Sequence, residues 1–207
     1  MKSLPKAEDV IDDFGDKVVE AFSRAVARAR ADFDAYRTSL PAWVAEASER
    51  GLASWIHDRM WHHLTVLVEG IPEVQVIDRE PTRELIVHGR YKLRAKRHGE
   101  EGRVSSYPTQ TAIEFLWEQD IIDGMVEELN LVVGYVWDSE LRGMGRPVLS
   151  LRDGREHKWM YDLPEVGTGA AYAPVRPIVP PQASPNAPRI DTSSDTQEQV
   201  ETEGENG

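Results

Sequence analysis

Apolar residues recur along the first part of the chain at steps of three and four, the spacing that predicts an amphipathic helix. These positions run from Val10 through Phe22 to Tyr36, with polar residues between them. Acidic residues crowd the start of the segment and arginines lie later, which suits the helix dipole. We therefore predict one long helix. Its apolar stripe faces either the helix's own domain or a second subunit, so an oligomer formed through this helix stays an open alternative.

The pattern then changes from a helical period to a period of two. Pro41 suits the first turn of a short helix that ends near Gly51, and a further helix is predicted from about Leu52 to Glu69. His88 and Gly89 favour a tight hairpin turn, since glycine tolerates positive φ. Alternating apolar residues around this turn predict three strands, at residues 74–77, 85–87 and 90–97.

The next elements complete the predicted fold. Pro108 begins another helix, residues 129–137 form the most strand-like segment, and residues 148–151 and 158–163 form a hairpin through Asp153 and Gly154. The order helices, three strands, helix, strand, hairpin is typical of an α+β fold. We predict N-terminal helices packed on a mainly antiparallel sheet of about six strands.

Composition divides the chain into three parts: an N-terminal helical segment (1–51), an α+β domain (52–167) and a tail (168–207). Six of the 13 prolines lie between Pro174 and Pro188, and the last 17 residues hold six acids and no base. Such a segment cannot bury enough apolar surface to offset its ordering entropy, so we expect the tail to be disordered.

The net charge of the 207 residues is −12. Six acids and two arginines give the tail −4, which leaves −8 for residues 1–167 and argues against coating nucleic acid by bulk charge. The chain has no cysteine and no run of apolar residues long enough to span a membrane. A cytoplasmic protein without thiol chemistry is the simplest interpretation.

A basic segment is the most informative feature of the sequence. In an extended chain, Arg90, Lys92, Arg94 and Lys96 share one face, with Arg97 beside them, while Tyr91, Leu93 and Ala95 take the other face. We expect Tyr91 and Leu93 to be buried and Arg90, Lys92 and Arg94 to be accessible to solvent. Like charges along one strand repel, so a compensating anion is expected. That anion is nucleic acid, an acidic protein partner, or the chain's own acids on a solvated face.

A nuclease-like domain is an alternative suggested by the order of elements from Leu52 to Trp137, which restriction-endonuclease-like domains share. Their sites need one acid and an acid-x-Lys pair to hold Mg²⁺. Asp78 is a candidate first acid, but no acid stands two residues before Lys92 or Lys96, and Glu84 lies one strand early. We therefore predict no catalytic residue, and the nuclease-like domain, active or degenerate, stays an alternative.

Histidines on a predicted helix are the remaining candidates for metal chemistry. His57, His62 and His63 lie close to Asp58, and Asp58 and His62, four apart, share a helix face as metal ligands often do. No third ligand stands at a telling spacing. We predict surface or satisfied histidines, with no metal site and no cofactor.

The string from Arg90 to Arg97 (RYKLRAKR), followed by Tyr107-Pro108-Thr109-Gln110 and Ala112, resembles a family of short uncharacterised proteins of bacteria and phages. The resemblance covers roughly residues 52–163. It adds Thr109 and Gln110 to the candidate binding residues. Genes of this family often stand beside zinc-peptidase or phage-repressor-like genes, which implies a regulatory or defence setting and no particular activity.

Taken together, these patterns favour a non-enzymatic regulatory or interaction protein of a phage-related or defence system. Its basic strand face would bind nucleic acid or an acidic protein partner. The nuclease-like domain is the first alternative. An acidic inhibitor that mimics DNA is a weaker one, because the net charge favours it and the basic strand opposes it.

Overall fold

The computed structural model describes residues 4–79, 82–104, 115, 120–122, 125–154 and 156–167. Three helices precede the strands. Their bounds are α1 (Ala7–Ser39), α2 (Pro41–Glu46) and α3 (Glu49–Val68), followed by β1 (Val74–Arg79), β2 (Thr82–Val87), β3 (Tyr91–His98), β4 (Asp120–Ile122), β5 (Met125–Asp138), β6 (Gly143–Asp153) and β7 (Glu156–Asp162). Within the described residues, no helix is both long and apolar enough to cross a membrane.

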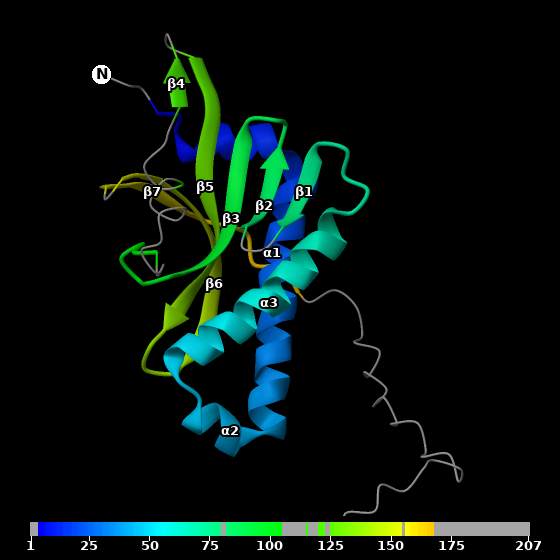
Figure 1. The fold of residues 1–207 in the computed structure, drawn as a ribbon, viewed down its shortest axis with the longest axis vertical. Helices are drawn as coiled ribbons and strands as arrows, with labels where there is room; N and C mark the ends of the chain where they lie inside the picture. The colour runs from blue at the N-terminus through cyan, green and yellow to red at the C-terminus, as the bar shows by residue number, and fades with distance from the viewer. Residues whose placement is uncertain are drawn as a thin grey trace, which may run out of the picture. The chain divides into compact units, whose positions relative to one another are not determined.

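The sheet has the order β1-β2-β3-β5-β6-β7, and β4 pairs with β5 off this path. Strands β3 and β5 are parallel, and the other described pairs are antiparallel. In Figure 1 the helices lie along one side of the sheet, with α3 crossing α1 diagonally and α2 near the tip of the β5–β6 hairpin. The predicted α+β fold, with helices first and a mostly antiparallel sheet after them, is confirmed.

The strand β4 was not predicted, and the predicted boundary after residue 51 falls inside α3. Of the helix expected from Pro108, the described part of the chain includes Phe115, which is helical. The tail expected to be disordered, residues 168–207, lies outside the described residues.

Helix α1 packs its apolar stripe against the rest of the core. Val10, Phe22 and Phe33 have no exposed surface and belong to one hydrophobic cluster with residues of α3 and the sheet. The stripe therefore faces the chain's own sheet. The predicted long helix is present, with a kink that was not predicted at Gly15, where φ is 71°. Glycine enters this region at little cost, so the two helical parts can meet there.

The alternation predicted for β3 is confirmed. Tyr91, Leu93 and Ala95 are buried on the face covered by the helices. The Tyr91 ring meets Phe14 of α1 edge-to-face, with ring centroids 5.1 Å apart, and its hydroxyl donates a hydrogen bond to Asp13. The alternate side chains of β3 point to the opposite face of the sheet, which we call the second face.

The parallel pair is unusually close at one point. Lys96 lies opposite Gly134, and a Cβ placed on Gly134 would stand 1.7 Å from the Lys96 carbonyl oxygen. No side chain can relieve this contact, because both partners are backbone. Glycine at position 134 is thus a condition for bringing β3 and β5 together.

We predict that Gly134→Ala lowers the free energy of unfolding by about 3 kcal/mol or more, because the strands must separate to admit the methyl group. Urea denaturation followed by circular dichroism measures this change. Gly143→Ala is the matched control, since its Cβ would meet nothing nearer than 3.9 Å. Equal stability of the two variants would contradict the close approach.

Candidate anion-binding site at the end of the basic strand

The cations at the start of the basic strand face acids of the same chain. Arg90 lies 3.5 Å from a carboxylate oxygen of Asp13 on α1. Lys92 lies 2.7 Å from Glu128 on β5. These side chains are partly exposed, so each pair adds little stability, but each carboxylate offsets a positive charge that an external anion would need.

Arg94 is more deeply held. Its guanidinium lies 2.6 Å from the Glu84 carboxylate, and both side chains are largely buried, at 15% and 8% exposure. The guanidinium also lies over the Phe115 ring, 4.1 Å from its centroid. The expectation that Arg94 is solvent-accessible was wrong, because Glu84 and Phe115 enclose it on the second face.

Lys96 differs from its neighbours on this strand. Within the described residues it has no carboxylate partner, and its ammonium is partly buried. Burial, and next the positive charge of Arg94, lower the pKa of Lys96. As far as the structure describes the strand, Lys96 is its one lysine without a carboxylate, whereas a nucleic-acid backbone requires a row of free cations.

Arg97 points to the helix side of the sheet, at the end of β3. Its guanidinium donates to Glu49 at 3.0 Å and lies over the Trp137 ring, 5.1 Å from the centroid. The other oxygen of Glu49 accepts from Arg142, also at 3.0 Å. Two guanidinium groups thus share one carboxylate, which leaves an excess of one positive charge at this place.

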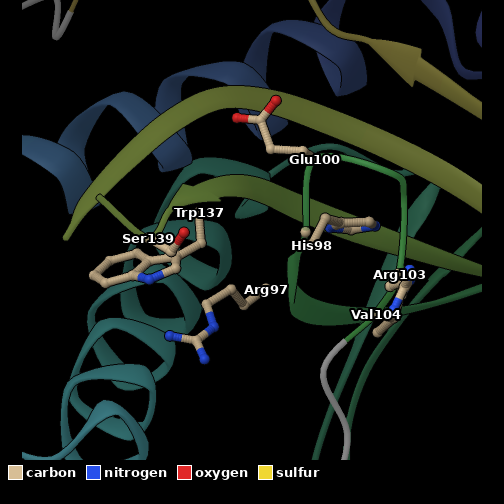
Figure 2. A pocket seen from close by; sticks show the side chains of 8 residues that line it. Arg97, His98, Glu100, Arg103, Val104, Trp137 and Ser139 are labelled. Carbon is tan, nitrogen blue, oxygen red and sulfur yellow. The ribbon is translucent and has the colours of Figure 1, made fainter. Parts of the chain in front are cut away.

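A pocket of about 390 Å³ opens beside Arg97 (Figure 2). It lies where β3 and β5 end, and because these strands are parallel, their carboxyl ends stand at the same edge of the sheet. Crevices at such ends are common ligand sites in α/β sheets. The lining residues are Arg97, His98, Gly99, Glu100, Arg103, Val104, Trp137 and Ser139.

The polar groups around the pocket are arranged asymmetrically. In Figure 2 the Glu100 carboxylate points away from the Arg97 guanidinium, while Arg103 stands on the other side of the opening. The Arg103 side chain is 82% exposed and pairs with Glu101 outside the pocket lining. Beyond Glu49, no hydrogen-bond partner of the Arg97 guanidinium is found in the described part of the chain. The pocket therefore has one arginine on each of two sides, and arginine is a residue that binds carboxylate and phosphate groups.

His98 forms the inner wall of the pocket and is fully buried. Its Nε2 lies 2.8 Å from the hydroxyl of Ser150, which is also fully buried. Burial, and after it the charges of His157 and Arg152, lower the pKa of His98 to about 4. His98 is therefore neutral at pH 7 and supports the pocket as a packed group, with no charge to offer an anion.

Asp78, the candidate first acid of a nuclease site, has partners within the protein. Asp78 accepts a hydrogen bond from the Trp61 indole at 3.0 Å and lies 3.4 Å from Arg83. Arg83 in turn pairs with Asp58 at 2.6 Å, so Asp58 is also occupied. No group of three or more potential metal ligands is found within the described ranges.

Of the histidines on α3, His57 and His63 lie near carboxylates, and His62 is exposed. His63 is buried and lies 2.8 Å from Asp32 of α1, which also binds Arg59 at 2.7 Å. This cluster joins α3 to α1. His57 lies 3.8 Å from Asp58, and burial, followed by the charge of Lys96, lowers the pKa of His57.

Thr109 and Gln110, which the resemblance added to the candidate residues, lie outside the described residues. The sequence patterns missed the pocket residues Arg103, Trp137 and Ser139, and also the ion pair of Glu49 with Arg142 beside the pocket. No spacing in the sequence links them, so the sequence offered no signal for this site.

Comparison with known proteins finds no matching family model, no matching curated protein and no matching solved structure.

The lowered pKa of His98 predicts a loss of stability in acid. A histidine whose pKa is about 6.5 when unfolded and about 4 when folded contributes fully above pH 6.5 and loses that contribution as the pH falls toward 4. Between pH 7 and pH 4.5 we expect His98 to remove about 2 to 3 kcal/mol of unfolding free energy. Urea denaturation at the two pH values measures it.

His98→Gln is the comparison variant for this measurement. It should show a smaller difference between the two pH values than the wild type, whatever its stability at pH 7. The remaining acid sensitivity belongs to His57, His63 and His157, whose pKa values are also lowered, chiefly by burial. An identical pH dependence in variant and wild type would show that His98 is protonated in the fold near its ordinary pKa.

Proposed function

We propose that this chain is a non-enzymatic interaction protein that captures an acidic group of a partner in the pocket at the end of β3. The observation that carries the proposal is the pocket at the carboxyl ends of the parallel strands β3 and β5, which Arg97 and Arg103 line. The resemblance noted from the sequence suggests a phage-related or defence setting for such a protein.

Charge pairing favours a protein partner over nucleic acid. Arg90, just before β3, faces Asp13, and Lys92 and Arg94 on β3 face Glu128 and Glu84 respectively. A nucleic-acid backbone presents phosphates in a long row and gains affinity by meeting several free cations. A carboxylate-bearing protein segment needs one or two arginines at a defined place.

Charge reversal at the pocket tests this proposal. Arg103→Glu should weaken binding of a fluorescent polyglutamate peptide by about five- to tenfold, the effect of roughly 1 kcal/mol at a partly exposed ion pair. Fluorescence anisotropy at low and moderate salt measures the affinity. Folding should be unchanged, because the Arg103 side chain is 82% exposed.

Two matched variants locate the binding site. Lys17→Glu makes the same change of charge at an exposed position of α1 and should have little effect. Lys92→Glu places the reversal on the second face, so a larger effect there than at Arg103 would move the site to the strand face. If Arg103→Glu binds polyglutamate as tightly as the wild type, the pocket proposal fails.

A degenerate nuclease-like domain is a second candidate, favoured by one specific arrangement. Glu84 on β2 stands beside Arg94 on β3, and Lys96 follows two residues later. An arginine thus occupies the place where an acid-x-Lys pair would carry its acid. The guanidinium fills the space next to Glu84 with a fixed positive charge, in place of the divalent cation that two carboxylates would hold.

For this candidate, we expect the wild-type protein to leave plasmid DNA uncut in Mg²⁺ or Mn²⁺. Arg94→Glu places a second carboxylate beside Glu84, so Mn²⁺ should raise the melting temperature of the variant by several degrees and leave the wild type unchanged. A variant that is equally stable in Mn²⁺ and in EDTA would argue against a lost metal site. Metal-dependent cleavage by the wild type would instead establish an active nuclease.

A further inference from the structure

Exposed apolar side chains gather beside the pocket. Leu141, in the turn between β5 and β6, is 73% exposed, and Trp43 on α2 is 64% exposed. Leu40, just before α2, is 37% exposed. Single exposed apolar residues are ordinary, but a tryptophan and two leucines at one end of a fold suggest a surface that a partner covers.

The turn that presents Leu141 is held rigidly. Arg142 has a φ of 46°, a left-handed conformation that costs a non-glycine residue roughly 1 kcal/mol. Its guanidinium donates to the carbonyl oxygens of Ala45 at 3.2 Å and Ala47 at 2.8 Å, which anchors the turn beside the end of α2. The Asp138 carboxylate accepts from the backbone N–H of Leu141 at 2.8 Å.

One carboxylate connects this turn to the pocket. Glu49 accepts from Arg142 through one oxygen and from Arg97 through the other, at 3.0 Å each. The pocket and the exposed apolar residues are therefore built on the same network of side chains. We call the combined region, Leu40, Trp43, Leu141 and the pocket arginines Arg97 and Arg103, the corner surface.

We propose that the corner surface binds a protein segment in which a carboxylate is flanked by apolar side chains. This inference rests on the function proposed above and names the partner's chemistry. The carboxylate enters the pocket that Arg97 and Arg103 line, and the apolar side chains cover Trp43 and Leu141. Tryptophan and arginine are the residues that most often dominate binding energy at protein interfaces.

Two peptides of equal charge test this inference on the full chain. The first alternates glutamate with leucine and phenylalanine over twelve residues, and the second has serine at the apolar positions. We expect the first peptide to bind at least about tenfold more tightly, because burying two or three apolar side chains adds more than 1.4 kcal/mol. Fluorescence anisotropy measures both affinities.

Substitutions at exposed apolar positions locate the contact. Trp43→Ala and Leu141→Ser should each weaken binding of the apolar peptide by about fivefold or more and leave the serine peptide unaffected. Val66→Ser is the matched control, since Val66 is 47% exposed on α3. Circular dichroism confirms that each variant is folded.

The outcomes separate the inference from the function on which it rests. Equal affinity for the two peptides, or no effect of either Trp43→Ala or Leu141→Ser, overturns the corner surface. If Arg103→Glu still weakens binding of the serine peptide in that case, the proposed function of the pocket holds without the apolar contacts. If Arg103→Glu changes the affinity of neither peptide, both the inference and the proposed function fail. Tighter binding of a duplex oligonucleotide of equal charge, lost on Arg103→Glu, would assign the pocket to nucleic acid and overturn the inference.

Discussion

The parallel pairing of β3 with β5 is the constraint on which the rest of the structure depends. It joins the β1-β2-β3 meander to the β5-β6-β7 meander, so one sheet forms in place of two small ones. It also brings two carboxyl ends to one edge, where the pocket lies. The pairing requires Gly134, because the Lys96 carbonyl occupies the space that any side chain there would need.

Electrostatics decides which cations remain for a partner. Asp13 of α1 meets Arg90 on the helix side of the sheet, while Glu84 of β2 and Glu128 of β5 pair with Arg94 and Lys92 on the second face. At the end of β3 positive charge exceeds negative charge, because Arg97 and Arg142 share the single carboxylate of Glu49. The strand with the strongest basic pattern is therefore less suited to anions than the pocket at its end.

The period of apolar residues predicted most elements, because an element with one buried face needs apolar residues at a regular spacing. The alternation in β3 is an example. The His88-Gly89 turn was predicted from its residue types, and both of its residues have positive φ. The kink at Gly15 and the short strand β4 were missed, since a single glycine or three residues carry too little pattern. Arg94 was expected in solvent because alternation tells which face a side chain takes and not what covers that face.

The sequence alone determined the fold class, the order of the elements and which side of β3 enters the core. Each of these follows from local periodicity and turn chemistry, which neighbouring residues encode. The tertiary structure alone decided the parallel register, the partners of the cations and the pocket. Glu49, Arg97, Trp137 and Arg142 are far apart along the chain and meet because α3, β3, β5 and the β5–β6 turn converge at one end of the sheet. Long-range pairing of this kind leaves no repeated spacing in the sequence, so it has to be read from the folded chain.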